Sequence, residues 1–242
     1  MRRRTLTDLA NNPDLISGIY NYCDRWCERC PLTSRCLVYA TEQEDNDSFE
    51  NHDLRNEVFW KKLGAVFQET RELIAEWANE AGFELNGHSD DDETRHPRKK
   101  QLVDNHPLTK AGKKYANAAS DWFREFDQSI DSDNSERLED AREVIQWYQY
   151  QIAVKTMRAL SGRKEEFEEA PELAELPKDS DGSAKVALIG IDRSIAAWRL
   201  MQLSLPERAG SIVPLILQLE RLRQRLERAF PEARAFIRPG FD

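Results

Sequence analysis

All four cysteines of the chain lie in one short segment, at positions Cys23, Cys27, Cys30 and Cys36. Their spacing is C-x3-C-x2-C-x5-C, and the rest of the chain contains no cysteine. Cysteines that merely fill a core would be scattered along the chain, although cysteine is often buried. A buried apolar cluster and a disulfide pair remain as alternatives, the second being disfavoured where thiols stay reduced. We therefore predict that the four thiolates bind a metal centre.

The type of metal depends on the backbone between these residues. In an α-helix Cys23, Cys27 and Cys30 share one face, with neighbouring Cβ atoms roughly 5–6 Å apart. A single tetrahedral zinc needs its sulfurs within roughly 3.8 Å of one another. A cubane cluster gives each thiolate its own iron, so the sulfurs sit on the order of 6 Å apart. A helix that persists through Cys30 therefore favours a [4Fe–4S] cluster, and one that unwinds after Cys27 permits a zinc turn.

The charge of the centre does not separate these two metals. Either one leaves about −2 on metal plus thiolates. Three arginines in the segment could balance that charge: Arg25, Arg29 and Arg35.

The stretch CERCPLTSRCLVYA, residues 27–40, resembles the cluster segment of WhiB-like iron–sulfur regulators. The pattern of that family is C-x2-C-P-φ-x3-C-L, where φ is a hydrophobic residue. An aromatic residue and an alanine follow soon after. The resemblance implies that Cys27, Cys30 and Cys36 hold a [4Fe–4S] cluster sensitive to oxidants. It does not extend to Cys23, since the family's remaining cysteine lies much further upstream. The family's GWGG turn and basic tail are absent.

Several other chemistries lack the residues that they need. C-x3-C-x2-C is also the spacing of radical-SAM enzymes, but the additional Cys36 and the absence of a βα repeat argue against that class. A ferritin-like di-iron core needs two inward Glu-x-x-His pairs, and the one such pair, Glu93 with His96, falls in a predicted loop. The sequence contains no P-loop, dinucleotide fingerprint, nucleophile elbow or zincin motif.

Composition narrows the range of partners. With 35 Lys and Arg against 44 Asp and Glu, the 242-residue chain has a net charge of −9, which opposes nucleic-acid binding. We expect a protein partner instead. No window approaches 18 consecutive apolar residues, and the arginines at positions 2–4 precede no hydrophobic stretch, so we expect a cytoplasmic protein without a membrane span. The oligomeric state does not follow from the sequence.

Apolar residues recur at helical spacing along most of the chain, and no convincing alternating strand is present. The predicted helices span residues 15–26, 34–40, 54–81, 108–130, 135–160, 184–205 and 211–229. Glycines at 82 and 162 are predicted to end helices, and Ser183 and Ser211 to begin them. Longer connections are predicted over residues 84–106 and 163–182.

These elements predict an all-α fold, a bundle of about five long helices with a short N-terminal Cys-rich helical hairpin. The hairpin, residues 1–45, is expected to bind the metal. The bundle is expected over residues 52–230, with a C-terminal tail over 231–242.

Lys185, Asp192 and Arg199 are spaced by seven on an otherwise apolar face of the predicted helix over 184–205, and Arg193 lies beside them. Lys155 lies on the apolar stripe of the predicted helix over 135–160. Buried charge is costly unless it is paired. One interpretation is a polar pocket in the bundle that binds a small anion or forms an active site. The other is an internal ion pair of Asp192 with Lys155 or Arg158.

The sequence therefore favours a metal-binding protein, with a [4Fe–4S] cluster in a redox-sensing or electron-transfer role. One alternative is a zinc-stabilised helical interaction scaffold without redox chemistry. The other is an enzyme that uses a polar pocket inside the bundle.

Overall fold

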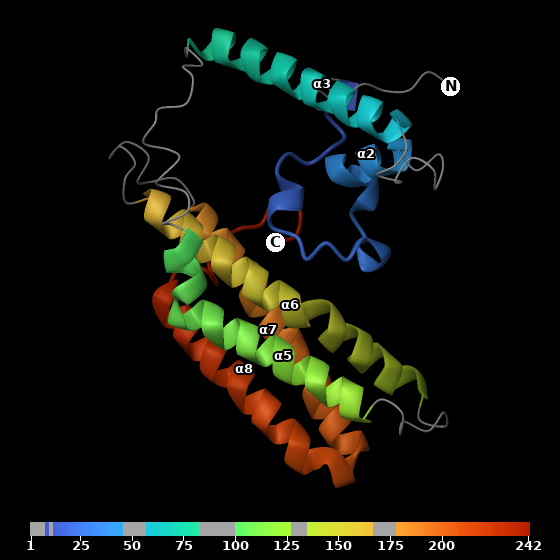
Figure 1. Ribbon diagram of the computed structural model, residues 1–242, viewed down its shortest axis with the longest axis vertical. Coiled ribbons are helices and arrows are strands. Elements are labelled where there is room, and N and C mark those ends of the chain that lie inside the picture. Colours follow the sequence, from blue (N-terminus) through green and yellow to red (C-terminus); the bar gives the residue numbers. More distant parts are fainter. Residues whose placement is uncertain (1–7, 10–11, 46–56, 83–99, 127–134, 167–177) are drawn as a thin grey trace. The chain divides into compact units, whose positions relative to one another are not determined.

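The computed structural model describes residues 8–9, 12–45, 57–82, 100–126, 135–166 and 178–242 (Figure 1). Within these ranges all regular structure is helical and no strand occurs, which confirms the all-α class. The long helices are α3 (Glu57–Ala81), α5 (Pro107–Phe126), α6 (Ser135–Glu166), α7 (Asp179–Ser204) and α8 (Ala209–Ala229). The short elements are α2 (Leu37–Asp45) and 3-10 turns at Ile19–Asn21, Cys27–Arg29, Thr33–Arg35 and Pro206–Arg208.

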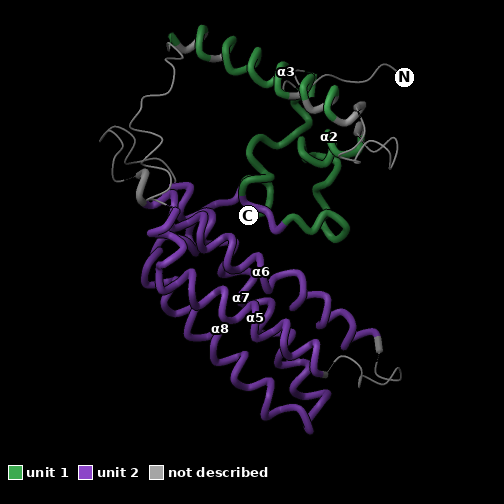
Figure 2. Tube along the Cα trace, in the orientation of Figure 1, with its two compact units in different colours: residues 1–21, 25–92, 239–242 green, residues 22–24, 93–238 purple. Residues whose placement is uncertain are grey.

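The chain divides into two compact units (Figure 2). Unit 1 comprises residues 1–21, 25–92 and 239–242, and unit 2 comprises residues 22–24 and 93–238. Helix α3, which the sequence grouped with the later helices, therefore belongs with the N-terminal cysteine segment. None of the described helices is long and apolar enough to cross a membrane.

Unit 2 is a four-helix bundle. Helix α6 packs on α5 and α7, and α8 packs on the same two helices, so that the four close a ring. Successive helices alternate in direction (Figure 1). The largest fully buried side chains of the bundle include Tyr115, Ile145, Tyr148, Ile152, Leu188, Ile191, Trp198, Met201, Ile212, Leu219 and Leu222.

Aromatic side chains form the centre of this core. Trp198 on α7 is fully buried, and its indole Nε1 donates to the hydroxyl of Tyr115 at 2.9 Å. Its ring meets Trp122 edge-on at 5.0 Å and stacks on Phe123 at 5.5 Å. Trp122 in turn donates to Ser211 Oγ at 2.9 Å. Each buried indole N–H thus has an acceptor, as burial of a polar group requires.

The predicted α-helix over residues 15–26 is not present. The chain there makes turns and one 3-10 turn, Ile19–Asn21. Gly18 (φ 71°) and Arg25 (φ 58°) both leave the right-handed helical region. A helix cannot continue through such positions, and for the non-glycine Arg25 the conformation is strained. The N-terminal segment therefore consists of cysteine-bearing 3-10 turns followed by α2.

Two predicted boundaries between α6 and α7 were wrong. Helix α6 continues through Gly162, so this glycine does not cap it, and an added Cβ there would make ordinary contact with Ser180 at 3.5 Å. Helix α7 begins at Asp179, and Ser183 is buried inside it. By contrast, Gly82 follows α3 with φ 74°, as predicted for a C-terminal cap.

The last helix also begins earlier than predicted. Helix α8 starts at Ala209, and Ser211 Oγ donates to the carbonyl of Arg208 at 2.8 Å from within its first turn. Residues 231–238 of the predicted tail over 231–242 belong to unit 2. Ala233 and Phe236 are buried, and Lys185 Nζ donates to the carbonyl of Phe236 at 2.6 Å.

Candidate metal-binding segment

In unit 1, 3-10 turns set the positions of three cysteines. Cys27 begins the turn Cys27–Arg29, and the amide of Cys30 closes it by donating to the Cys27 carbonyl at 3.2 Å. Cys36 closes the turn Thr33–Arg35 in the same way, at 3.2 Å from the Thr33 carbonyl. Cys30 and Cys36 both have extended backbone, so the chain changes direction at each of them.

One backbone amide of the segment donates a hydrogen bond to a cysteine sulfur. The N–H of Leu32 donates to Sγ of Cys30 at 3.4 Å, across Pro31. Amide hydrogen bonds to sulfur stabilise the thiolate form and are among the levers by which proteins tune metal–thiolate centres. Pro31 has no N–H of its own, which leaves the next amide as the donor.

The thiols themselves are accessible and reduced. All four cysteines are half-buried, and none forms a disulfide. The disulfide alternative and the fully buried apolar cluster therefore do not describe this structure. Thiols of this exposure remain reachable by a metal ion or an oxidant.

The arginines of the segment make contacts of their own. Arg25 lies 3.7 Å from Glu42 in an exposed ion pair, and Arg29 sits over the ring of Trp26 at 4.2 Å. Arg35 Nε donates to the carbonyl of Asp14 at 3.2 Å. These contacts hold three cationic groups on the cysteine segment.

The three cysteines of unit 1 are not gathered into a metal site. Among the described residues, no three His, Cys, Asp or Glu side chains come together as metal ligands. Cysteine thiolates are suitable ligands for a metal, but these side chains are not arranged around a common metal position. Cys23 belongs to unit 2, where residues 22–24 join the helical bundle.

A cluster of polar side chains holds Asp24, the neighbour of Cys23, on the bundle. Arg193 Nη1 donates to the Asp24 carboxylate at 2.8 Å, and the hydroxyl of Tyr148 donates to the same oxygen. The Asp24 carbonyl accepts from Trp147 Nε1 at 2.9 Å and from Gln151 Nε2. Both the side chain and the backbone of Asp24 are therefore fixed by α6 and α7.

Tyr148 of this cluster and Tyr22 both have raised pKa values. Burial, reinforced by the Asp24 carboxylate, raises the pKa of Tyr148 far above its ordinary value, against the opposing charge of Arg193. Burial and then a hydrogen bond to Asp179 raise the pKa of Tyr22 to about 12. Both hydroxyls therefore stay protonated at alkaline pH values at which an ordinary tyrosine ionises.

The Asp24 cluster could not be found from sequence. Arg193 was interpreted as part of a polar pocket, and nothing in the sequence linked Trp147 or Tyr148 to Asp24. Tyr148 is buried, and these side chains bind a residue more than a hundred positions away. The one available signal was an aspartate directly after the first cysteine.

The charged residues of the bundle pair differently from the prediction. Asp192 binds Arg234 at 2.7 Å and Arg223 at 3.3 Å rather than Lys155 or Arg158. Arg158 binds Asp179 at 3.1 Å instead. The region around Asp192 is thus an ion-pair network with arginines of α8 and the C-terminal segment, which the sequence did not connect to α7.

Comparisons with protein-family models, with curated proteins and with solved structures found no match to this chain.

Proposed function

We propose that the cysteine segment binds a metal centre through Cys23, Cys27, Cys30 and Cys36, and that this centre is a [4Fe–4S] cluster used in redox sensing or electron transfer. The observation that carries the proposal is the confinement of all four cysteines to one segment, half-exposed and without a disulfide. The hydrogen bond that the Leu32 amide donates to Cys30 Sγ supports a thiolate at that position. When bound, the cluster supplies one-electron chemistry.

Binding requires the segment to close around the metal. Metal sites rarely exist preformed in the absence of the ion, and the binding free energy then drives local folding. The cysteine turns are suited to such a change, because 3-10 turns are short and have weaker hydrogen-bond geometry than α-helices. The half-buried sulfurs leave room for movement.

Zinc is the second candidate, and a specific observation favours it. An α-helix through Cys30 would favour iron, whereas Cys27 and Cys30 are joined by a single 3-10 turn. Such a turn permits the shorter sulfur–sulfur separation that tetrahedral zinc demands. A zinc-bound protein would be a helical interaction scaffold without redox chemistry.

Oxygen-free purification of the full chain, with metal and sulfide analysis and a visible spectrum, tests the proposal. A cluster protein is brown, contains about four irons and four sulfides per chain and bleaches with dithionite. A colourless protein with about one zinc per chain would identify the scaffold and exclude the redox role. Protein that binds neither metal after reconstitution would overturn both.

Single substitutions then assign the ligands. Cys27→Ser, Cys30→Ser and Cys36→Ser are each expected to lose most of the metal, and Cys23→Ser tests the fourth position. Ser34→Ala is the matched control, because it changes the same segment without removing a thiol. Equal metal loss in the control would mean that the segment's folding, and not its sulfur, is what the substitutions disturb.

A further inference from the structure

Asp24 is fixed on the helical bundle at both its side chain and its backbone. The carboxylate accepts from Arg193 Nη1 on α7 at 2.8 Å and from the hydroxyl of Tyr148 on α6. The carbonyl accepts from Trp147 Nε1 at 2.9 Å and from Gln151 Nε2, both also on α6. Only 23% of the Asp24 side chain is exposed, so the carboxylate relies on these donors. Contacts with both groups set the orientation of the residue as well as its position.

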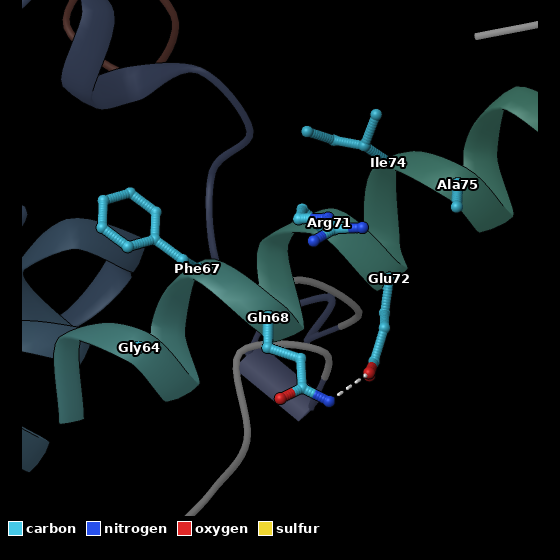
Figure 3. Close-up of a pocket in the computed structure, with 7 residues that line it drawn as sticks. All are labelled: Gly64, Phe67, Gln68, Arg71, Glu72, Ile74 and Ala75. Carbon is cyan, nitrogen blue, oxygen red and sulfur yellow. Dashed lines mark hydrogen bonds between the residues drawn. The ribbon is translucent and has the colours of Figure 1, made fainter. Parts of the chain in front are cut away.

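The hollow on helix α3 of unit 1 has no comparable arrangement (Figure 3). Among the described residues its lining comes from that helix alone, between Gly64 and Ala75. The hydrogen bond drawn there, from Gln68 Nε2 to the Glu72 carboxylate at 3.1 Å, is also internal to the helix. Residues that support a functional group are held by packing and hydrogen bonds from the surrounding scaffold. Asp24 meets that condition, and the hollow does not.

Tyr22, on the other side of Cys23, is docked on the same bundle. Its ring lies 4.7 Å from the ring of Phe236, centroid to centroid. It also fills the space that a Cβ at Gly182 would occupy, since such an atom would overlap the ring. Residues 22–24 accordingly belong to unit 2 together with α6 and α7.

Cys23 therefore lies between two anchored neighbours. A trans peptide bond places consecutive Cα atoms about 3.8 Å apart, so the Cys23 backbone cannot move far without detaching Tyr22 or Asp24. The main remaining freedom of the thiol is rotation about χ1 among a few staggered positions. The other three cysteines lie at 3-10 turns that single backbone hydrogen bonds close.

The backbone directly after Asp24 is strained. Arg25 has φ 58°, a region that non-glycine residues rarely adopt. Such a conformation persists only where the surrounding structure fixes it, and it clusters at ligand clamps and active sites. The contacts of Asp24 fix the residue that precedes this position.

We propose that Asp24 is a positioning residue for the metal centre, because its contacts with α6 and α7 hold Cys23 as a ligand that is in place before the metal binds. This inference rests on the proposed metal-binding function. A ligand that is fixed beforehand loses less conformational entropy when the metal binds. Groups that orient metal ligands typically contribute about 10- to 100-fold in metal affinity.

Metal retention by the full chain tests this role. The protein is loaded without oxygen with iron and sulfide and, separately, with zinc, and the release of metal to excess EDTA is measured. Asp24→Ala should release the metal about tenfold faster than the wild type. Asp24→Asn should restore most of the retention, since its amide oxygen can still accept from Arg193 and Tyr148. This rescue separates positioning from charge, because an aspartate that acted by attracting the metal would be lost in both variants.

A double-mutant cycle tests whether Asp24 acts through Cys23. In the Cys23→Ser background, Asp24→Ala should change the release rate by less than about twofold. Asp192→Ala is the matched control, since it breaks the ion pair with Arg234 elsewhere on α7 and should leave the release rate unchanged. Arg193→Ala removes the same contact from the bundle at a side chain that is 54% exposed. It should act in the same direction as Asp24→Ala, and it replaces that variant if far-UV circular dichroism shows that Asp24→Ala loses its helices.

The outcomes distinguish this role from the function on which it rests. A wild type that holds neither iron nor zinc would overturn both. If the wild type holds metal, unchanged release in Asp24→Ala and Arg193→Ala would overturn the positioning role alone. So would a loss in Asp24→Asn as large as that in Asp24→Ala, an equal loss in Asp192→Ala, or additive effects of Asp24→Ala and Cys23→Ser.

Discussion

The helical bundle of unit 2 and the cysteine segment of unit 1 are stabilised in different ways. The bundle buries large side chains such as Trp198, Tyr115 and Leu219 almost completely. The cysteine segment has half-buried thiols on 3-10 turns that are closed by single backbone hydrogen bonds. Burial of apolar surface is the dominant favourable contribution to folding, so the bundle can be stable without a metal. The cysteine segment has much less of this contribution, and metal binding would add to its stability.

The largest expected effect is in the bundle core. Trp198→Ala removes a fully buried indole that contacts Tyr115, Trp122 and Phe123, and should lower the free energy of unfolding by about 3–5 kcal/mol. Urea unfolding followed by far-UV circular dichroism measures it. Leu203→Ala, at an exposed position of the same helix, should change the value by less than about 0.5 kcal/mol. A loss below 1 kcal/mol for Trp198→Ala would show that this core is not what stabilises the bundle.

The next effect concerns the attachment of residues 22–24 to the bundle. A Cβ at Gly182 would lie 2.3 Å from the ring of Tyr22 and 2.7 Å from that of Phe236. Gly182→Ala should therefore cost about 1–3 kcal/mol through overpacking, despite the better helix propensity of alanine. Gly210→Ala is the matched control, because a Cβ there meets nothing within 4 Å. Equal thermal stability of the two variants would contradict close packing at Gly182.

Alkaline pH should act on the bundle through its buried tyrosine. Burial raises the pKa of Tyr115 to about 12. Between its ordinary value near 10 and this value, the unfolded chain loses the proton while the folded chain keeps it, so stability falls as pH rises. The slope from this group is about 1.4 kcal/mol per pH unit, and the contribution is fully present below pH 10.

Unfolding in urea at several values between pH 8 and 12 measures this slope. Tyr115→Phe should lower the slope by about 1.4 kcal/mol per pH unit and leave the contributions of Tyr22 and Tyr148. The variant starts from lower stability because Trp198 loses its acceptor. Tyr150→Phe, at an exposed position, should keep the wild-type slope. An unchanged slope in Tyr115→Phe would mean that Tyr115 is not the group responsible.

The smallest expected effect is that of metal removal on the stability of the bundle. Metal removal by a chelator, or Cys30→Ser, should change the unfolding free energy of the bundle by less than about 0.5 kcal/mol. The same treatments should increase protease cleavage within residues 12–45, because the segment loses its ligand. Circular dichroism and limited proteolysis of one sample report the two outcomes separately. A loss of several kcal/mol from the bundle would show that its stability depends on the metal.

The predictions from sequence were most accurate for the long helices, where the apolar spacing repeats over many turns. The helices predicted over 54–81 and 108–130 correspond to α3 and α5, and the helically spaced Tyr115, Ala119 and Trp122 of α5 are buried. The prediction failed over residues 15–26, because four apolar residues at helical spacing do not make a helix when Gly18 and Arg25 adopt positive φ. Short helices depend on tertiary packing more than on propensity.

By itself, then, the sequence determined the helical class, the extents of most long helices and the confinement of all thiols to one segment. These properties are local, since they follow from spacing along the chain. The partners of Asp24 and Asp192, the close packing at Gly182 and the placement of α3 in unit 1 were decided only by the tertiary structure. Each of these depends on residues that are distant in sequence, and side-chain periodicity says which face of a helix is buried but not which other residue meets it.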